Sequence, residues 1–390
     1  MKKKIFLIIW SQPNFYQTLI FLANHLSNKG FEVSIYCIKE KISKLSKNIV
    51  FSKKCKVKNS SINIKVKNFF FNFINLIFFV LYCLKDFLKF KPNNVIFFNQ
   101  KSLYCQFIFN FFKKKTNNFI YHNFDFEDPN KIKVLKNILN SKIEFLLSNY
   151  SDYLIFPSSG RVNVYKKYLN KKNNNYYSFK NCFPISFKPK FSNQLNRKFG
   201  KLIKNKKIIC QLGSIGPSHH LDEIVSSGKY LSKNYLIIIA GISVGSYADY
   251  LKIKVKNLNL KNKILILENI KDKLWFEILN KCSLGLCFYE GKYLSHKNMA
   301  GTSQKFNNYL FLNKPMLVNN NNDFKKFKKN HDIYNMVNPC SPKEIAKQIN
   351  YILKNKKRYK KIKMNMNFQF KKELNFEKQF SNSYKKILNI

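Results

Sequence analysis

The sequence predicts an α/β protein with two Rossmann-like domains that face each other across a cleft, and three observations support this prediction. In both halves of the chain, short apolar segments of strand length alternate with longer segments of helical period, which is typical of parallel sheets covered on both faces. A polar connection near 185–205 separates the two halves. The length of 390 residues is enough for two cores of ordinary size.

The N-terminal half begins with an apolar strand, an amphipathic helix that ends at Gly30, and a second strand. Further helical stretches precede each of the later strands, so the strands are expected to pair in parallel. We expect the helix at 15–30 and strands at 4–10, 31–38, 94–98, 119–122 and 153–157.

The segment 69–90 is the longest apolar stretch in this half of the chain. Asn72 and Asn75 interrupt it, and Lys85 and Asp86 follow too soon for a membrane span. We predict a core helix that leads into the strand at 94–98. The alternative is an interfacial helix that brings the protein to a lipid-linked acceptor, and it stays open.

The C-terminal half repeats the alternation of strands and helices. Its expected strands lie at 208–212, 235–241, 264–268, 284–288 and 316–318. A glycine-containing turn, Gly213 to Pro217, follows the first of these strands, and a helix opens near Ser218. Glycine at such a turn lets backbone amides approach a pyrophosphate closely. The turn therefore predicts a phosphate site that includes Gly213 and Ser214.

The segment 302–318 is predicted to be a loop, a short amphipathic helix and a buried strand. Thr302 and Ser303 can cap the helix, whose free N–H groups and positive dipole end favour an anion. Lys305 supplies a counter-charge on the first turn. A capped helix occurs in any α/β protein, so the prediction of a phosphate site depends on this segment together with the upstream turn.

The two segments lie about ninety residues apart with βα units between them, and in this order they resemble the C-terminal half of a GT-B glycosyltransferase. The most similar family is the large retaining family 4, the glycosyl transferases group 1. Its members often carry a glycine-rich turn and, later, a Ser-x-Lys-x-x-Glu-Tyr-like helix before a Lys-Pro strand entry. Here that helix reads Ser303-Gln304-Lys305-Phe306-Asn307-Asn308-Tyr309.

The resemblance implies three parts: an acceptor-binding domain at 1–190, a nucleotide-sugar-binding domain at 205–360, and a C-terminal helical segment at 361–390 that crosses back to the first domain. It also implies that a His or carboxylate after the strand at 119–122 faces the transferred sugar. His122 is the first candidate, followed by Asp125 and Glu127. The alternative is that the two acids cap the next helix and that His122 only packs there.

Further donor contacts follow from the same resemblance. The backbone around 268–271, including Ile270, is expected to read the nucleotide base. The loop residues Gly301, Thr302 and Ser303 are expected to lie at the phosphates with Lys305. His219 is a second candidate for the diphosphate. The alternative, which the sequence favours slightly, is that His219 and His220 are exposed capping residues at a helix start.

The chain departs from the family pattern at its carboxylates. Many family members carry two glutamates eight positions apart, one facing the donor sugar and one the ribose. The corresponding positions here are Ala300 and Asn308. Asn308 can still hydrogen-bond a ribose hydroxyl, because an amide both donates and accepts. Glu290 is the candidate that replaces the missing sugar contact.

The formal net charge of +51, from 71 basic and 20 acidic residues, suggests at first a nucleic-acid-binding protein. The basic residues are spread along the whole chain, however, and Arg occurs only at positions 161, 197 and 358. Because Arg is the residue that reads guanine and clamps phosphates with two hydrogen bonds, we expect no nucleic-acid partner. Peripheral contact with an anionic membrane remains compatible with this charge.

The nine cysteines show no CxxC pair and no close His partner, which argues against a zinc site and a disulfide framework. The apolar run at 5–10 ends at Ser11 without a cleavage site, so no secretory signal is expected. We expect a cytoplasmic protein, with the inner face of the membrane as an alternative location, and neither a bound metal nor another cofactor.

Together these features predict an enzyme that transfers a sugar from a nucleotide-sugar donor to a glycan or lipid-linked acceptor of a surface polysaccharide or glycolipid. Retention of configuration is implied by the family resemblance alone. The missing glutamates leave a second hypothesis, a catalytically inactive relative that binds glycan or acts as a scaffold. A nucleic-acid-binding protein is the third hypothesis and is the one least supported by the sequence.

Overall fold

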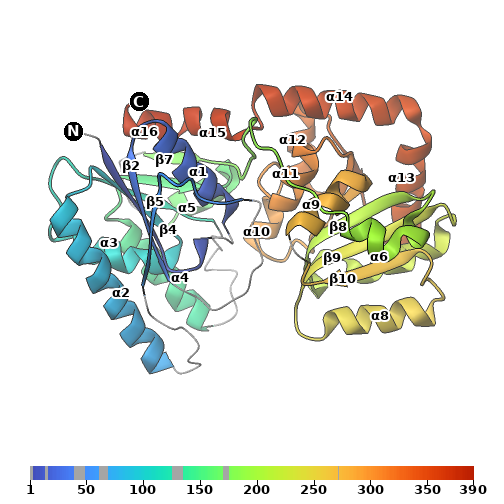
Figure 1. The fold of residues 1–390 in the computed structure, drawn as a ribbon, viewed down its shortest axis with the longest axis horizontal. Helices are drawn as coiled ribbons and strands as arrows, with labels where there is room; N and C mark the ends of the chain where they lie inside the picture. The colour runs from blue at the N-terminus through green and yellow to red at the C-terminus, as the bar shows by residue number, and fades with distance from the viewer. Residues whose placement is uncertain are drawn as a thin grey trace.

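The computed structural model describes residues 3–13, 16–38, 49–60, 69–124, 135–169, 175–270 and 272–390. Within these residues two parallel sheets form two domains that lie side by side (Figure 1). The predicted α/β fold with two Rossmann-like domains is confirmed.

The N-terminal sheet has the strand order β3-β2-β1-β4-β5-β6-β7, and every pair in it is parallel. Its central strands are apolar on both faces, as helices on both sides of a parallel sheet require. The strands are β1 Lys4–Ile9, β2 Glu32–Ile38, β3 Lys56–Ser60, β4 Asn94–Phe98, β5 Asn118–His122, β6 Tyr153–Phe156 and β7 Tyr176–Ser178.

The C-terminal sheet has the order β10-β9-β8-β11-β12-β13, again with parallel pairs throughout. In both sheets the order reverses beside the first strand of the domain, and ligands of open α/β sheets bind outside the carboxyl ends of the strands at such a point. The strands are β8 Lys207–Ile215, β9 Tyr235–Ser243, β10 Ile264–Glu268, β11 Cys282–Cys287, β12 Met316–Asn319 and β13 Asn335–Val337.

The helices connect these strands and cover the sheets (Figure 1). Those of the N-terminal domain are α1 Gln17–Asn28, α2 Phe69–Phe90, α3 Leu103–Asn110, α4 Leu135–Ser148 and α5 Ser159–Lys166. Those of the C-terminal domain are α6 Gln194–Ile203, α7 Leu221–Ser227, α8 Tyr247–Asn257, α9 Asp272–Lys281, α10 Leu294–Lys297, α11 Gln304–Phe311, α12 Asn322–Asn330, α13 Pro342–Lys354 and α14 Lys356–Lys372.

The end of the chain returns to the N-terminal domain through α15 Phe376–Asn382 and α16 Tyr384–Leu388 (Figure 1). Asn375 caps α15, because its side chain accepts a hydrogen bond from the Lys378 amide. The Phe376 amide donates to the Phe183 carbonyl (2.9 Å). The two helices therefore hold the connection between the domains against the N-terminal core.

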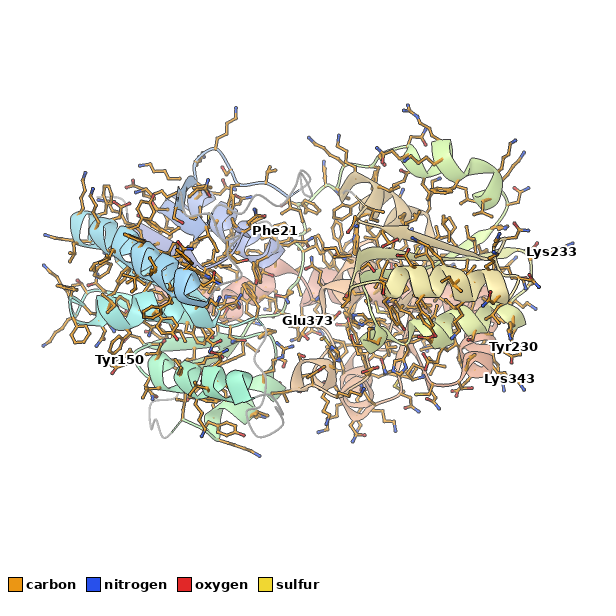
Figure 2. All side chains as sticks on the ribbon, turned by 90° about the horizontal axis from the view of Figure 1, so that it is seen from below. Phe21, Tyr150, Tyr230, Lys233, Lys343 and Glu373 are labelled. Atoms are coloured by element: carbon orange, nitrogen blue, oxygen red, sulfur yellow. The ribbon has the colours of Figure 1, made fainter. Side chains whose placement is uncertain are left out.

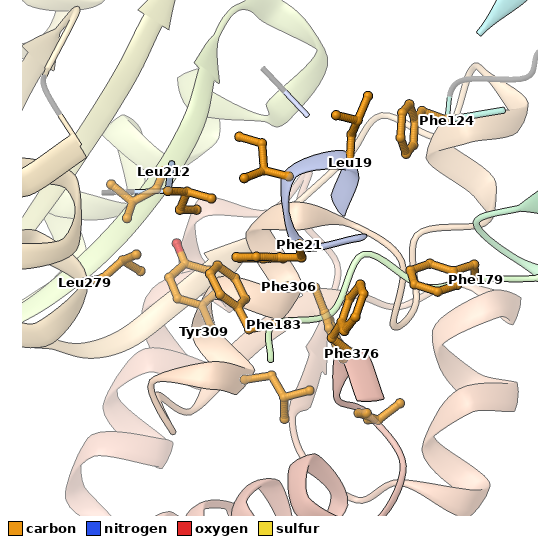
Figure 3. Packing of buried hydrophobic residues seen from close by; sticks show 14 of the residues in the cluster. Leu19, Phe21, Phe124, Phe179, Phe183, Leu212, Leu279, Phe306, Tyr309 and Phe376 are labelled. Carbon is orange, nitrogen blue, oxygen red and sulfur yellow. The ribbon is translucent and has the colours of Figure 1, made fainter. Parts of the chain in front are cut away.

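One apolar cluster runs through both domains and joins them (Figure 3). Phe183 lies in the connection between the domains, which in the structure is the segment 179–193 between β7 and α6, and it stacks on Phe311 of the C-terminal domain with ring centres 4.5 Å apart. It also lies 5.5 Å from Phe21 of the N-terminal domain, centre to centre. Because aromatic pairs bury a large area with specific geometry, this contact fixes how the two sheets face each other.

The helix α2 differs from the core helix that we predicted for 69–90. Its 20-residue stretch Phe71–Phe90 is long and apolar enough to cross a membrane by length and composition, yet only 22% of its apolar window is buried. Phe79, Cys83 and Phe87 form the buried strip, while Phe78 and Leu81 are exposed. The prediction was therefore right for one side of the helix and wrong for the other.

Candidate functional site

A cleft with a volume of about 290 Å³ lies between the two domains at the carboxyl ends of their strands. This volume is close to the lower end of the range of ligand sites, which is roughly 300–1,000 Å³. The N-terminal domain and the connection contribute Tyr16, Gln17, Thr18, Phe124, Pro157, Arg161 and Asn181. The C-terminal domain contributes Gly213, Ser214, His219, Tyr289, Met299, Thr302, Ser303, Gln304 and Lys305.

The last residues of β8 form part of the C-terminal side of the cleft; Gly213 and Ser214, predicted to be in a turn, belong to this strand, which continues to Ile215. Gly213 has φ +138°, a conformation that side chains rarely adopt. A Cβ at the neighbouring Gly241 would lie 1.4 Å from the Gly213 carbonyl oxygen, so the two strand ends approach too closely for any other residue there. The Lys305 side chain also lies close, with its Cε 3.3 Å from the Cβ position of Gly213.

The N-terminus of α11 opens into the same cleft. Ser303 caps the helix, since its Oγ accepts a hydrogen bond from the Phe306 amide (3.2 Å). The Tyr289 hydroxyl hydrogen-bonds the same Oγ and so fixes the capping side chain. Backbone N–H groups at a helix N-terminus and the helix dipole favour an anion, and this end of α11 presents both to the cleft.

Lys305 lies on the first turn of α11 and is 6% exposed. Its Nζ lies 4.8 Å from the centre of the Tyr289 ring. When the Gln211 amide is oriented to donate to the Leu286 carbonyl (2.7 Å), its oxygen accepts from Lys305 Nζ (2.6 Å). Burial lowers the pKa of Lys305 to about 8. Within the described residues no carboxylate pairs with this amine, so its charge is available to a bound anion.

His219 is held as a neutral acceptor at the cleft wall. Burial, with a smaller contribution from the charge of Lys305, lowers the pKa of His219 to about 3. Its Nδ1 lies 3.3 Å from the Phe288 carbonyl oxygen, and a carbonyl only accepts, so the proton sits on Nδ1. Nε2 is therefore the acceptor, which suits a sugar hydroxyl better than a diphosphate. The neighbouring His220 is left-handed (φ 53°) and lies 3.8 Å from Glu223.

The structure places His122 in the core beside the cleft rather than on its wall. The side chain is fully buried, and its Nδ1 lies 2.7 Å from the Tyr384 hydroxyl of α16. Burial lowers the pKa of His122 to about 3. The residue that lines the cleft here is Phe124, which stacks on Tyr16 with ring centres 4.9 Å apart. The candidates Asp125 and Glu127 lie outside the described residues.

The remaining predicted donor residues fall into two groups. The first group lines the cleft and consists of Gly213, Ser214, His219, Thr302, Ser303 and Lys305. The second group does not line it and consists of Ile270, Glu290, Gly301 and Asn308. Gly301 shapes the loop, since it has φ +71° and a Cβ there would lie 2.7 Å from the Phe327 ring. Ile270 packs against the core, and the Glu290 carboxylate pairs with Lys292 Nζ (3.2 Å). Asn308 is buried, with an Oδ1 that has no hydrogen-bond partner among the described residues.

The sequence analysis did not predict the hydrogen bonds that join the N-terminal domain to the anion site at α11. Asn181 connects the two domains: its Nδ2 donates to the Thr302 carbonyl (3.1 Å) and its Oδ1 accepts from the Thr18 hydroxyl (2.9 Å). Arg161 donates to the Phe124 carbonyl (2.5 Å) and to the Ser295 carbonyl (3.5 Å). Thr18 lies in α1, Arg161 in α5 and Asn181 after β7, so these contacts join parts of the chain that are far apart in sequence.

Comparisons with known proteins agree with this architecture. Residues 192–367 match the sequence model of the family described as glycosyl transferases group 1. No curated protein matches the sequence.

Solved structures match over the whole chain at low identity. HepE from Anabaena in complex with UDP-glucose superposes with a TM-score of 0.73 at 13% identity, over 99% of this chain and 100% of that chain. Sucrose-phosphate synthase from Thermosynechococcus elongatus gives 0.72 at 10% identity, with 100% of both chains covered. WaaG, a glycosyltransferase involved in lipopolysaccharide biosynthesis, gives 0.62 at 11% identity over 94% of each chain. The chain therefore has the GT-B fold, and its residues 192–367 match glycosyl transferases group 1.

Proposed function

We propose that the protein transfers a sugar from a nucleoside-diphosphate donor, bound in the interdomain cleft, to an acceptor of surface polysaccharide or glycolipid synthesis. The observation that carries the proposal is Lys305: a buried amine without a carboxylate partner among the described residues, beside a capped helix N-terminus. Keeping a cation in such a place costs free energy unless an anion joins it. A diphosphate satisfies both the amine and the helix.

In the proposed mechanism, the anion site acts mainly on the leaving group. As the sugar–phosphate bond breaks, negative charge grows on the diphosphate, and the α11 N-terminus with Lys305 stabilises it. His219 Nε2 orients the sugar by accepting from one of its hydroxyls. The cleft walls from both domains exclude water, which favours transfer over hydrolysis.

Retention of configuration is part of the proposal. A glycosidase-type mechanism requires two carboxyl groups at the reacting carbon. No Asp or Glu lines the described part of the cleft. We infer that the acceptor hydroxyl attacks from the side on which the diphosphate leaves, with a diphosphate oxygen taking its proton.

The acceptor class rests on similarity alone. WaaG acts in lipopolysaccharide biosynthesis, and an envelope glycan or glycolipid fits the proposed acceptor of this chain. A cytoplasmic location is proposed because all nine cysteines are free, eight of them buried, as expected under reducing conditions. We also propose that no metal is needed, since Lys305 and α11 supply positive charge at the diphosphate.

Nucleotide binding and turnover test the proposal in two steps. A ligand that binds only the folded state raises the melting temperature, so one of UDP, GDP, ADP or CMP should do so. Release of that nucleotide from its sugar donor, stimulated by a glycolipid extract, then tests transfer.

The absence of glutamate at positions 300 and 308 favours one second candidate, an inactive relative that binds glycan or scaffolds other proteins. An inactive relative can show a nucleotide-induced shift in melting temperature or none, but it releases no nucleotide from a sugar donor. Release that depends on both the donor and the acceptor extract would exclude it.

A further inference from the structure

We propose that the outer side of the N-terminal domain docks on an anionic lipid membrane through α2 and the adjoining ends of α3 and α4. We call this surface the α2 face. Its exposed apolar side chains are Phe71, Phe73, Ile77, Phe78, Leu81 and Leu88 on α2, with Phe111 and Phe112 after α3 and Leu146 and Tyr150 at the end of α4.

The helix α2 is apolar on both its buried and its exposed sides. Phe79, Cys83 and Phe87 pack inward, and Phe87 stacks on Phe109 of α3 with ring centres 4.5 Å apart. Phe78 and Leu81 point outward and are 58% and 54% exposed. A surface helix of a soluble domain normally turns charged or polar residues to water. The outward side of α2 instead combines these exposed apolar side chains with Lys85 and Lys89, which is the pattern of a helix that docks on a membrane surface.

The apolar surface continues beyond α2. Phe107 of α3 contacts both Phe111 and Tyr150, with ring centres 5.4 Å and 5.5 Å apart. In Figure 2 the helices α2, α3 and α4 lie side by side on one face of the domain, with Tyr150 at the edge of α4. Contiguous apolar patches of this kind mark interaction sites.

The charge of the α2 face identifies the partner. Its exposed lysines are Lys85, Lys89, Lys91, Lys114, Lys115 and Lys142. Each acidic residue on the described parts of the three helices and their ends is either paired with a lysine or buried. Asp86 pairs with Lys58 (2.5 Å), Asp152 pairs with Lys113 (2.6 Å), and Glu144 is buried. Apolar side chains surrounded by unopposed lysines fit a bilayer that carries anionic head groups.

Docking on the surface fits the structure better than crossing the bilayer. The inward side of α2 belongs to the core of the N-terminal domain, where Phe79 and Cys83 are fully buried. Moving the helix into a membrane would expose that core to water. A helix lying in the plane of the interface keeps the core contacts and buries only the outward side.

Flotation with lipid vesicles tests the proposal on the full-length protein. We expect binding to phosphatidylcholine vesicles that contain about one third phosphatidylglycerol, and little binding to phosphatidylcholine alone or at high salt. The double variant Phe78→Ser/Leu81→Ser should bind anionic vesicles at least about tenfold more weakly. The double variant Lys85→Glu/Lys89→Glu should lose about the same amount of affinity for anionic vesicles, and its binding should depend less on salt.

Matched controls come from α14, which lies on the opposite edge of the molecule in Figure 1. Met364 and Phe368 are 62% and 58% exposed, and Lys357 and Lys360 are exposed lysines on the same helix. The variants Met364→Ser/Phe368→Ser and Lys357→Glu/Lys360→Glu should bind vesicles like the wild type. Unchanged nucleotide-induced melting shifts would show that all four variants are folded.

Three results would overturn the proposal. The first is equal vesicle binding by the α2 and α14 variants. The second is a wild-type protein that does not bind anionic vesicles. If that protein is a dimer and Phe78→Ser/Leu81→Ser makes it a monomer, a second copy of the chain covers the α2 face. The third is retention in the membrane after an alkaline wash, which would indicate a spanning helix. Because nucleotide binding is measured separately, failure here is distinguishable from failure of the proposed transferase.

Discussion

Replacing Lys305 by Met tests whether the buried amine serves a ligand rather than the fold. Met keeps an unbranched stem against Gly213 but carries no charge. The pKa of Lys305 falls from 10.5 to about 8 on burial. This lowering of the pKa corresponds to about 3 kcal/mol that the fold loses by keeping the Lys305 amine charged without a bound anion. The variant should therefore be as stable as the wild type without ligand, or more stable by up to about 3 kcal/mol.

The same substitution should weaken nucleotide binding. A hydrogen bond to a charged group contributes roughly 1.5–3 kcal/mol, so the dissociation constant for the preferred nucleoside diphosphate should rise about 10- to 150-fold. In the wild type, affinity should fall as pH rises through about 8, because Lys305 loses its proton. The contribution of Lys305 to stability runs the other way. The unfolded chain binds more protons between the folded pKa of about 8 and the ordinary lysine pKa of 10.5, so stability rises with pH in that window.

Calorimetric titration and urea unfolding measure the two effects separately. Lys314→Met is the matched control, because Lys314 lies beyond the other end of α11, where its Nζ donates to the Asn280 carbonyl (2.5 Å). It should leave nucleotide affinity and its pH dependence unchanged. A Lys305→Met protein that binds nucleotide normally, or that loses stability while binding is retained, would show that the Lys305 amine serves the fold and not a ligand.

Three further predictions follow from the same geometry. Gly241→Ala should lower the free energy of unfolding by about 3 kcal/mol or more, because its Cβ would lie 1.4 Å from the Gly213 carbonyl oxygen. Gly200→Ala is the control and should not lower it, because the space around its Cβ is open. Urea unfolding measures both variants. His219 should stay neutral down to about pH 4, so its imidazole NMR signals should not titrate between about pH 5 and 8; a midpoint in that range would contradict the burial argument. Chelation with EDTA should leave donor turnover unchanged, and a loss restored by Mg²⁺ or Mn²⁺ would show that the positive charge at the diphosphate is supplied by a metal.

The fold was predictable because its central strands are buried on both faces and therefore occur in the sequence as continuous apolar segments. The segments at 94–98 and 264–268 were predicted with the bounds that the structure shows. The strands β3, β7 and β13 were missed. They lie at sheet edges, are three to five residues long, and only partly buried, so they lack the apolar run that marks a central strand.

The C-terminal side of the cleft was predictable and the N-terminal side was not. The cap at Ser303 and the charge at Lys305 are local features, so the sequence places them together. The position of His122 depends on Tyr384, 262 residues further along the chain, whose helix covers the strand end. Asn181 depends likewise on contacts with Thr18 and Thr302. Contacts of this range have no signature in a single sequence.

For α2 the sequence analysis kept an interfacial helix only as an alternative. Apolar residues of α2 lie on both its buried and its exposed side, so the sequence alone did not show which side is left uncovered. Only the packing of Phe79, Cys83 and Phe87 against the core shows which side is left uncovered.

Hydrogen exchange with and without saturating nucleoside diphosphate is the most direct test of the central claim, that the donor diphosphate binds at the N-terminus of α11. We expect slower exchange in peptides that cover 213–216 and 302–306, and loss of that protection in Lys305→Met. Protection confined to the N-terminal domain, or unchanged by that substitution, would contradict it.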